Sequence, residues 1–447
     1  MSSNVSQRPG SPATWSILGS GLPAAILLLS ASMASLAALP ATAAEKGNPS
    51  SDWPQFLGPS RNGISRETGL LKSWPADGPK QVFRVRGGVG MSGVAVHNGR
   101  AVTLLQRGGK QMVVALDALT GKTLCEVPVA PEYSNSMGNG PRATPALAGD
   151  MAYVFTGEGI LAGVDLKTAR VVWSHDTLDE LGGREAEYGM ASSPLLVGDV
   201  VVVTPGAAKG TVAAYDRKTG EPRWQTISGS GRDTAGYSSP TVLDAGGVSQ
   251  IVALGGKAVI GIAPRSGDLL WRYPYPTNFD CNIAVPIAQE GRILISAGEN
   301  HGSVLLALRP KTFEITPVWE SHGPDSVLRN EWQTSILLDG ALYGMDNVGG
   351  AGPVTHLTCV DFATGKRLWQ RKRFGKGNLI AADGKLFLSM MSGELIVLKA
   401  NPKEYEELGR AEVISSTRQA PSLANGLLYL RDDREILCLD VREPSTP

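Results

Sequence analysis

A turn-and-strand motif recurs along the chain at intervals of about fifty residues, and this repetition limits the folds open to it. The motif, D-x-x-T-G-x-x-x-W, is clearest at residues 216–224 and 361–369. Its first three Asp residues, Asp117, Asp165 and Asp216, follow one another at 48 and 51 residues. A unit of this length is typical of one four-stranded propeller blade.

A second marker runs in step with the first. Each motif follows a short strand of small residues or Pro, a Gly turn and another strand, as in "ATPALAGDMAYVFTG", and eight such copies occur. The strands are short and rich in Val and Ile, and Gly, Asn or Asp bounds them. We therefore predict an all-β fold, an eight-bladed β-propeller of four-stranded blades.

The two ends of the repeat array complement each other. The last repeat stops after its third strand near Val441, and an unassigned strand at 80–87 precedes the first repeat. We predict that the N-terminal strand completes the last blade and closes the ring, which protects the sheet edges. The expected organisation is a signal peptide at 1–44, a lead-in segment at 45–79, the propeller at 80–443 and a C-terminal tail at 444–447.

The first 44 residues are set apart by composition. An apolar run of small residues at 17–40 is followed by Ala41-Thr42-Ala43, a pattern typical of a cleaved signal peptide. An uncleaved membrane anchor is the alternative, but Gly, Ser and Pro interrupt the run. No Cys follows it for lipid attachment. We expect a periplasmic or extracellular protein with no transmembrane segment after cleavage.

Each part of the repeated motif has a structural explanation. The Asp accepts backbone hydrogen bonds in a turn, the Gly adopts positive φ, and the Trp packs between neighbouring blades. Cys125 and Ala169 replace the Trp and the Gly in single blades. The residues assigned to this structural repeat are Asp117, Asp165, Trp173, Asp216, Trp224, Trp271, Trp319, Asp361, Gly365 and Trp369.

These residues resemble the quinoprotein-type, or PQQ-like, propeller repeat over about residues 53–443. The repeat is also similar to that of the non-catalytic propellers of bacterial outer-membrane assembly. For the dehydrogenases of the family, the resemblance implies a PQQ quinone, calcium, an Asp base and a disulfide between adjacent cysteines. The four cysteines here, Cys125, Cys281, Cys359 and Cys438, are never adjacent, and no acidic cluster stands out. We predict no cofactor, and PQQ with calcium belongs only to an alternative function.

Other signatures of chemistry do not occur in the sequence. The five histidines have no metal-binding spacing, and the cysteines form no CxxC pair. We therefore predict no catalytic residue and no metal ligand. The chain carries 42 basic and 42 acidic side chains, so its charge does not favour a nucleic-acid partner.

A ligand site is expected where loops lead into the innermost strands at one mouth of the central channel. Residues there differ from blade to blade, so repeat packing does not explain them. Solvated loop residues are the alternative interpretation of each. The candidates are Arg142, Tyr188, Tyr237, Asp280, Asn282, Asn330, Trp332, Lys376, Asn378 and Arg418.

Two functions remain open on this basis. The first is an exported, non-enzymatic propeller that binds a protein, peptide or small ligand at this loop face, with a protein or peptide partner in the cell envelope. The second is a PQQ-dependent oxidoreductase acting on alcohols or sugars, which rests on the resemblance alone.

Overall fold

The computed structural model describes residues 51–444 apart from 76, 230–233, 246, 310 and 351–353. The chain divides into two units, Met1–Pro49 and Ser50–Pro447, and every described residue belongs to the second. The predicted signal peptide at 1–44 and most of the predicted C-terminal tail lie outside the described residues.

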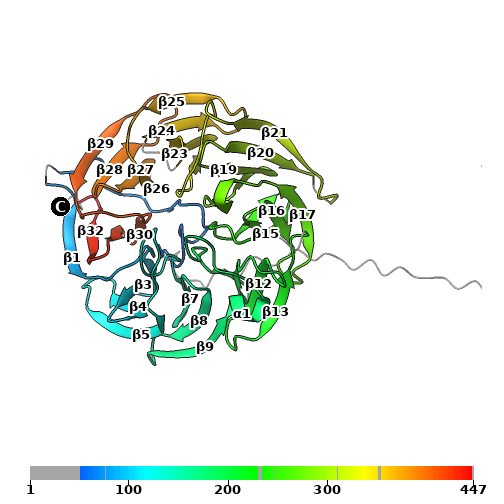
Figure 1. Cartoon of the computed structure of the whole chain (residues 1–447). Helices are drawn as coiled ribbons and strands as arrows, with labels where there is room; N and C mark the ends of the chain where they lie inside the picture. Colours follow the sequence, from blue (N-terminus) through cyan, green and yellow to red (C-terminus); the bar gives the residue numbers. More distant parts are fainter. Residues whose placement is uncertain are drawn as a thin grey trace, which may run out of the picture. The chain divides into compact units, whose positions relative to one another are not determined.

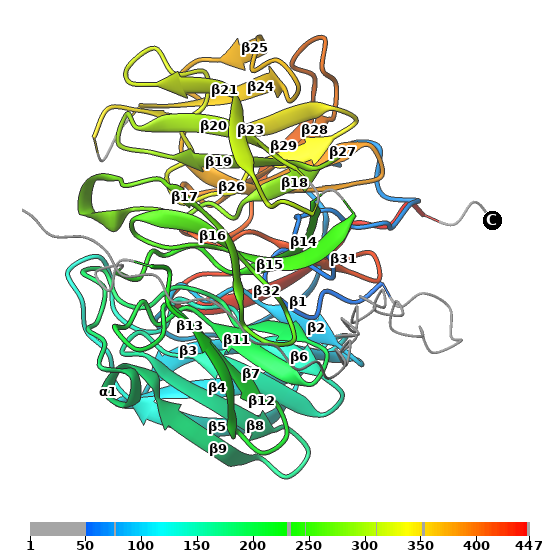
Figure 2. The same cartoon turned by 90° about the vertical axis from the view of Figure 1, so that its right-hand side faces the viewer.

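Eight four-stranded antiparallel sheets, formed by the described residues, surround a common axis (Figures 1 and 2). Blades 1–7 each use four consecutive strands, the first nearest the axis and the fourth at the rim. The eighth blade has the order β30-β31-β32-β1, so its rim strand comes from the N-terminal side of the chain. This arrangement confirms the predicted eight-bladed propeller and its closure.

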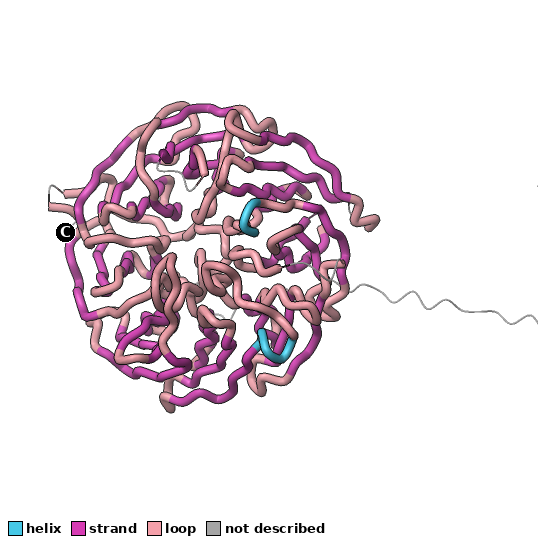
Figure 3. The backbone as a smooth tube through the Cα atoms, in the orientation of Figure 1, coloured by secondary structure: helices cyan, strands magenta, loops and turns pink. Residues whose placement is uncertain are grey.

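The strands are short, and loops make up much of the remainder (Figure 3). The strands of blades 1–4 are β2 (Ala95–His97), β3 (Arg100–Arg107), β4 (Lys110–Asp117), β5 (Thr123–Pro131), β6 (Ala146–Ala148), β7 (Met151–Phe155), β8 (Ile160–Asp165), β9 (Arg170–Asp176), β10 (Leu195–Val197), β11 (Val200–Val203), β12 (Val212–Asp216), β13 (Pro222–Thr226), β14 (Thr241–Ala245), β15 (Val248–Leu254), β16 (Ala258–Ile262) and β17 (Leu269–Pro274). Those of blades 5–8 are β18 (Ile287–Gln289), β19 (Arg292–Ala297), β20 (Gly302–Leu308), β21 (Ile315–His322), β22 (Ile336–Leu338), β23 (Ala341–Val348), β24 (Val354–Asp361), β25 (Arg367–Arg371), β26 (Gly377–Ala382), β27 (Lys385–Met390), β28 (Glu394–Lys399), β29 (Glu407–Glu412), β30 (Ser422–Ala424), β31 (Leu427–Arg431), β32 (Glu435–Asp440) and β1 (Lys80–Arg86).

Helix is scarce in the described part of the chain. It is confined there to α1 (Thr177–Leu181), which Asp176 and Gly182 cap, and to the 3-10 turn η1 (Asn278–Asp280). Neither is long and apolar enough to cross a membrane.

Neighbouring blades interlock through an aromatic ring and a glycine. The ring of a rim strand lies against the turn glycine of the next blade, so that a Cβ on that glycine would lie 2.7–2.9 Å from a ring atom. The pairs are Phe83 with Gly121, Trp173 with Gly220, Trp224 with Gly267, and Trp319 with Gly365. The indole N–H groups of Trp173 and Trp319 also donate to backbone oxygens of the next blade, at 3.2 and 3.0 Å.

The Asp of the motif holds the same turn in shape. The Asp361 carboxylate accepts from the backbone N–H of Thr364 at 2.8 Å, while Gly365 adopts φ +69° and donates to the Asp361 carbonyl. The carboxylates of Asp117, Asp165 and Asp216 accept equivalent bonds. In the turns of Asp117, Asp216 and Asp361, these bonds place Gly121, Gly220 and Gly365 against the ring of the preceding blade.

Departures from the motif in one blade match departures in its neighbour. Ala169, with φ 55°, occupies the glycine position of blade 2, and blade 1, which packs against it, carries Cys125 in place of Trp. In blade 5, Phe313 occupies the glycine position with φ 55°, and Trp271 of blade 4 donates its indole N–H to Gln250 within its own blade. At these two boundaries, the departure in the turn of one blade therefore faces a departure in the rim strand of the preceding blade.

A buried arginine fastens the closing blade to the first. Arg431 in β31 is only 1% exposed, and its guanidinium donates to the carbonyl oxygens of Leu104, at 2.8 Å, and Gly88. It also reaches the Thr103 hydroxyl at 3.2 Å. Burial lowers the pKa of Arg431 to about 10, which leaves the side chain charged at neutral pH. The charge is satisfied by backbone oxygens at the point where the ring closes.

The lead-in segment runs across one end of the central channel (Figure 1). Trp53 exchanges two backbone hydrogen bonds with Val96 of blade 1, at 2.8 and 2.9 Å. The Arg61 guanidinium, 3% exposed, donates to the Ser193 and Pro194 carbonyls of blade 3 at 3.0 and 2.6 Å. Further along, Gly63 accepts from the backbone N–H of Ala381 in blade 7 at 2.8 Å. The segment thus ties together blades that are not neighbours.

Replacing Arg431 with Ala should lower the free energy of unfolding by about 3 kcal/mol, because the buried carbonyls of Gly88 and Leu104 lose a charged donor. Urea denaturation followed by tryptophan fluorescence measures the change. Arg86→Ala, an exposed change in the adjoining rim strand, should alter it by less than about 0.5 kcal/mol. Equal urea midpoints for the two variants would show that Arg431 does not stabilise the closure of the ring.

The glycine interlock can be isolated with a matched pair of variants. Gly365 and Gly384 have nearly equal φ, +69° and +67°, but only a Cβ at Gly365 would meet a ring, that of Trp319 at 2.9 Å. Gly384→Ala should cost about 1 kcal/mol for the backbone alone. Gly365→Ala should cost about 2–3 kcal/mol in the same denaturation assay, since overpacking adds to that term. Equal losses would show that the ring contact contributes nothing.

Candidate functional site

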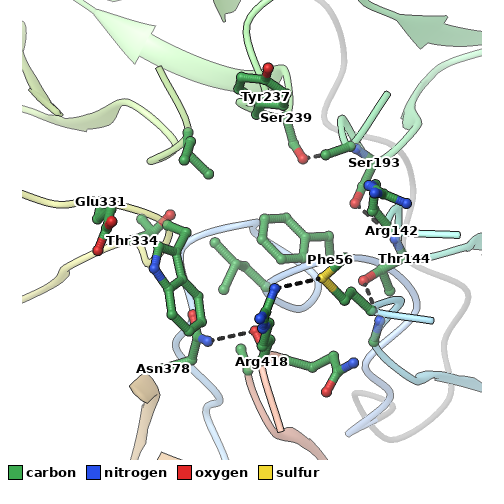
Figure 4. A pocket seen from close by; sticks show the side chains of 18 of the residues that line it. Phe56, Arg142, Thr144, Ser193, Tyr237, Ser239, Glu331, Thr334, Asn378 and Arg418 are labelled. Carbon is green, nitrogen blue, oxygen red and sulfur yellow. Dashed lines mark hydrogen bonds between the residues drawn. The ribbon is translucent and has the colours of Figure 1, made fainter. Parts of the chain in front are cut away.

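All eight blades contribute to a cavity of 440 Å³ at the centre of the ring (Figure 4). Its walls come from the loops that lead into the innermost strands, and each blade supplies different side chains. The volume lies in the range of small-molecule sites.

The floor of the cavity comes from the lead-in segment. Trp53, Phe56 and Leu57 line it, and Trp53 and Leu57 are 2% and 4% exposed. Gly58 allows this packing, since a Cβ there would lie 2.9 Å from the Trp53 ring. The segment therefore closes one end of the channel with an apolar surface and leaves a cup.

Small hydroxyl residues that line the cavity link neighbouring blades by hydrogen bonds. Thr144 accepts from the Gly93 N–H at 3.1 Å, Ser193 from the Thr144 N–H at 3.0 Å, and Ser239 from the Ser193 N–H at 2.9 Å. Each bond joins one blade to the next, and Thr144, Ser193 and Ser239 all line the cavity. The small residues of the second sequence marker are therefore needed both for blade contact and for open space at the axis.

Arg142 forms one wall, and backbone oxygens hold its guanidinium in place. It donates to the carbonyls of Tyr188 at 2.6 Å, Gly138 at 2.8 Å and Gly140, and it lies 4.8 Å from the centre of the Tyr133 ring. Burial lowers the pKa of Arg142. Since no carboxylate among the described residues is hydrogen-bonded to it, Arg142 brings positive charge to the cavity in a fixed position.

Trp332 and Lys376 form a second wall. The Lys376 ammonium lies 2.7 Å from a Glu331 carboxylate oxygen and 5.8 Å from the centre of the Trp332 ring. Trp332 is half-buried, and its backbone N–H donates to Gln333 at 2.9 Å. The loop thus positions the ring, and Trp332 lines the cavity.

Arg418 reaches into the cavity from the eighth blade. Its guanidinium donates to the Met137 carbonyl at 2.9 Å and lies 3.6 Å from the Met91 sulfur. Asn378 donates to the Arg418 carbonyl at 2.8 Å. Met91 and Met137 also line the cavity, so Arg418 combines a cation with polarisable apolar neighbours.

Two tyrosine rings and a cysteine thiol form another part of the cavity wall. The Tyr188 and Tyr237 rings stack with centroids 5.8 Å apart, and the Tyr188 N–H donates to the Tyr237 hydroxyl at 3.3 Å. Cys281 lies beside them, and burial together with the Glu299 carboxylate raises its thiol pKa to about 11. The thiol is therefore protonated at neutral pH and is a poor nucleophile.

The structure brings seven of the ten sequence-predicted candidates around this cavity. These are Arg142, Tyr188, Tyr237, Trp332, Lys376, Asn378 and Arg418. Their ligand-binding role stays a prediction.

The other three candidates are not among the lining residues. Asn282 is fully buried and donates to the carbonyls of Gly255 and Tyr275, and Asn330 is 1% exposed and donates to Met345. Asp280 pairs with Lys257. These side chains shape the loops by holding backbone groups or a neighbouring charge.

Sequence reasoning did not identify the floor residues as part of the site. Trp53, Phe56 and Leu57 belong to a segment that was assigned only as a lead-in, outside the repeat. A signal for them was present, since three large apolar residues in a polar segment outside the repeat need burial somewhere. No sequence pattern indicated that these residues would be buried at the ring axis.

The fold and the repeat define the class, an eight-bladed propeller of PQQ-like repeats. The family model described as outer membrane protein assembly factor BamB matches residues 74–226 and 109–371, more than half of the chain, so the chain belongs to this family. It is 21% identical to the outer membrane protein assembly factor BamB of Yersinia pestis over 311 residues, which cover 67% of this chain and 75% of that protein.

A second kind of relative is an enzyme. The chain is 26% identical over 298 residues to the quinohemoprotein alcohol dehydrogenase ADH IIB of Pseudomonas putida, covering 57% of this chain. It spans only 41% of the length of that dehydrogenase. A europium-containing methanol dehydrogenase shares the fold with a TM-score of 0.66 at 13% identity, covering 86% of this chain and 89% of that one.

The side chains around the cavity do not match the quinone and calcium implied by the quinoprotein resemblance. Arg142 and Lys376, which could bind quinone carboxylates, already bind backbone carbonyls and Glu331. Within the described residues, no group of three or more His, Cys, Asp or Glu could hold a metal ion. Cys281 is a free thiol. The donor set therefore does not fit the pair as a unit.

Cys281 should react with iodoacetamide at pH 8 about tenfold more slowly in the folded protein than after unfolding in urea. Raising the pKa from 9.0 to about 11 reduces the thiolate fraction, and the greater nucleophilicity of the thiolate offsets part of that loss. Mass spectrometry of the peptide that contains Cys281 measures both rates. A faster reaction in the folded protein would indicate an activated thiol.

Proposed function

We propose that this protein is an exported, non-enzymatic β-propeller scaffold that binds a protein, peptide or small ligand in the axial cavity. The supporting observation is a cup to which all eight blades contribute different side chains. Packing of the repeat accounts for the Trp and Gly residues, but not for an open space lined by Trp332, Arg418 and Lys376.

The chemistry of the cup favours a ligand with both apolar and polar groups. Its floor and the Trp332 wall offer apolar and aromatic surface, while Arg142 and Arg418 fix positive charge at defined points. Such sites gain affinity from buried apolar area and orientation from a few polar groups. Because the cup is held by the closed ring, a ligand does not have to order it.

A partner in the cell envelope is consistent with the relatives. The matched family and the Yersinia pestis relative are named as outer membrane protein assembly factors. On this proposal the mature chain acts in the periplasm or outside the cell, and the propeller presents its loop face to that partner.

The second candidate function is a PQQ-dependent oxidoreductase acting on alcohols or sugars. The alignment with the quinohemoprotein alcohol dehydrogenase favours it. The cavity would then hold the quinone, although its donor set differs from the expected one.

The two functions separate in one binding and turnover experiment on the mature protein. We expect 8-anilinonaphthalene-1-sulfonate, an aromatic anion, to bind saturably at one site, and Trp332→Ala to weaken binding about tenfold through lost aromatic contact. Fluorescence titration measures both. PQQ with calcium and an electron-accepting dye should give no turnover of alcohols or sugars.

Leu119→Ala is the matched control, since Leu119 is 65% exposed on the rim turn of blade 1. It should leave dye binding unchanged, and circular dichroism should show that both variants fold. Equal binding by wild type and Trp332→Ala would place the dye outside the cavity and count against the proposal. Saturable quinone binding with turnover would establish the oxidoreductase instead.

A further inference from the structure

A second recess lies at the rim between blades 6 and 7, apart from the axial cavity. It has a volume of 550 Å³. Its lining, which we call the basic groove, consists of Gln370, Arg371, Lys372, Arg373, Phe374, Tyr405, Glu407 and Arg410. These residues come from the end of β25, the loop toward β26, Tyr405 before β29, and β29 itself; β25 and β29 are the rim strands of neighbouring blades (Figure 1).

Positive charge is concentrated at this groove. Four basic side chains, those of Arg371, Lys372, Arg373 and Arg410, line it with one acidic side chain, Glu407, in a chain whose formal charge is zero. Arg371, Lys372 and Arg373 are all exposed. A local excess of this kind attracts anions to one place on an otherwise neutral protein.

Two of these cations have no partner in the described part of the chain. No hydrogen bond or ion pair there involves the side chain of Lys372 or Arg373, and Arg371 lies over the Tyr405 ring at 5.3 Å. Arg410 differs, because its guanidinium binds Glu407 at 2.7 Å and Glu394 at 2.9 Å. Among the described residues, Lys372 and Arg373 therefore remain available to bind an anion, whereas Arg410 is already paired.

Aromatic rings form the inner surface of the groove. The Tyr405 ring meets Phe374 and Trp369 edge-on, with centroids 6.0 and 6.2 Å apart. The Tyr405 hydroxyl donates to Glu407. Fixed rings beside free cations provide apolar contact for one side chain and charge for its neighbours.

We propose that the basic groove binds an acidic peptide segment in extended conformation, with carboxylates on Lys372 and Arg373 and an apolar side chain against Tyr405 and Phe374. Clusters of basic residues recognise acidic motifs in this way. A recess between two blades suits a narrow chain more than a flat lipid surface. This proposal stands independently of the axial cavity.

The probe is a fluorescein-labelled peptide, EEFEE, and its uncharged match is QQFQQ. Fluorescence anisotropy with the intact mature protein should show saturable EEFEE binding in 50 mM NaCl, about tenfold weaker in 300 mM NaCl because salt screens exposed charges. QQFQQ should bind at least about tenfold more weakly than EEFEE.

The double variant Lys372→Glu with Arg373→Glu should weaken EEFEE binding more than about tenfold. The matched control is Lys110→Glu with Lys209→Glu, which changes the net charge equally at exposed sites on blades 1 and 3. It should bind within about twofold of wild type. Binding of 8-anilinonaphthalene-1-sulfonate in the axial cavity should be the same in both, which shows that the propeller is intact.

Several results would overturn the proposal. Absence of saturable EEFEE binding, or equal losses in the two double variants, would show that the groove is not a specific site. Competition by inorganic phosphate as strong as by unlabelled EEFEE would mean a site for small anions. Binding to phosphatidylglycerol vesicles without EEFEE binding would assign the groove to a lipid surface.

Discussion

Antiparallel pairing of β1 with β32 is the interaction on which the rest of the structure depends. It joins residues from opposite ends of the repeat array, with Phe83 opposite Cys438, and leaves no blade without its fourth strand. A closed ring removes free lateral edges and keeps every blade in contact with two neighbours. The Arg431 guanidinium reinforces this closure with bonds to carbonyls in and before blade 1. Without closure, neither the glycine interlock nor the axial cup would have a fixed geometry.

The closed ring separates two sets of residues: those that pack between blades and those that line the axis. Side chains of the repeated motif act at boundaries between blades, where Trp173 meets Gly220 and Trp319 meets Gly365. The exceptions also occur in pairs at a boundary: Ala169 replaces Gly in the blade that faces the one in which Cys125 replaces Trp. Residues at the axis escape this constraint, because their neighbours across the cup belong to other blades. The axis is therefore where the sequence is free to vary without loss of the fold.

Repetition explains why the fold could be predicted from the sequence and why much of the site could not. The motif at 361–369 carries its own turn chemistry, and eight copies specify the number of blades. The loop positions of Arg142, Trp332 and Arg418 could be predicted because a propeller places such loops at one mouth. Periodicity could not show that Asn282 and Asn330 turn inward to bind carbonyls, since that depends on local loop paths. Nor could it place the non-repeating lead-in segment across the channel.

The two kinds of relatives share one scaffold, so the fold cannot decide between them. What distinguishes a binding protein from an enzyme on this scaffold is the set of polar groups at the axis that a ligand can reach. Arg142 already donates to three carbonyl oxygens, and Lys376 is paired with Glu331, so both act first as parts of the wall. The Cys281 thiol, with its raised pKa, is protonated among carboxylates. The axial cup therefore combines an apolar floor with cations that neighbouring groups hold in place, an arrangement that would orient a ligand at the axis.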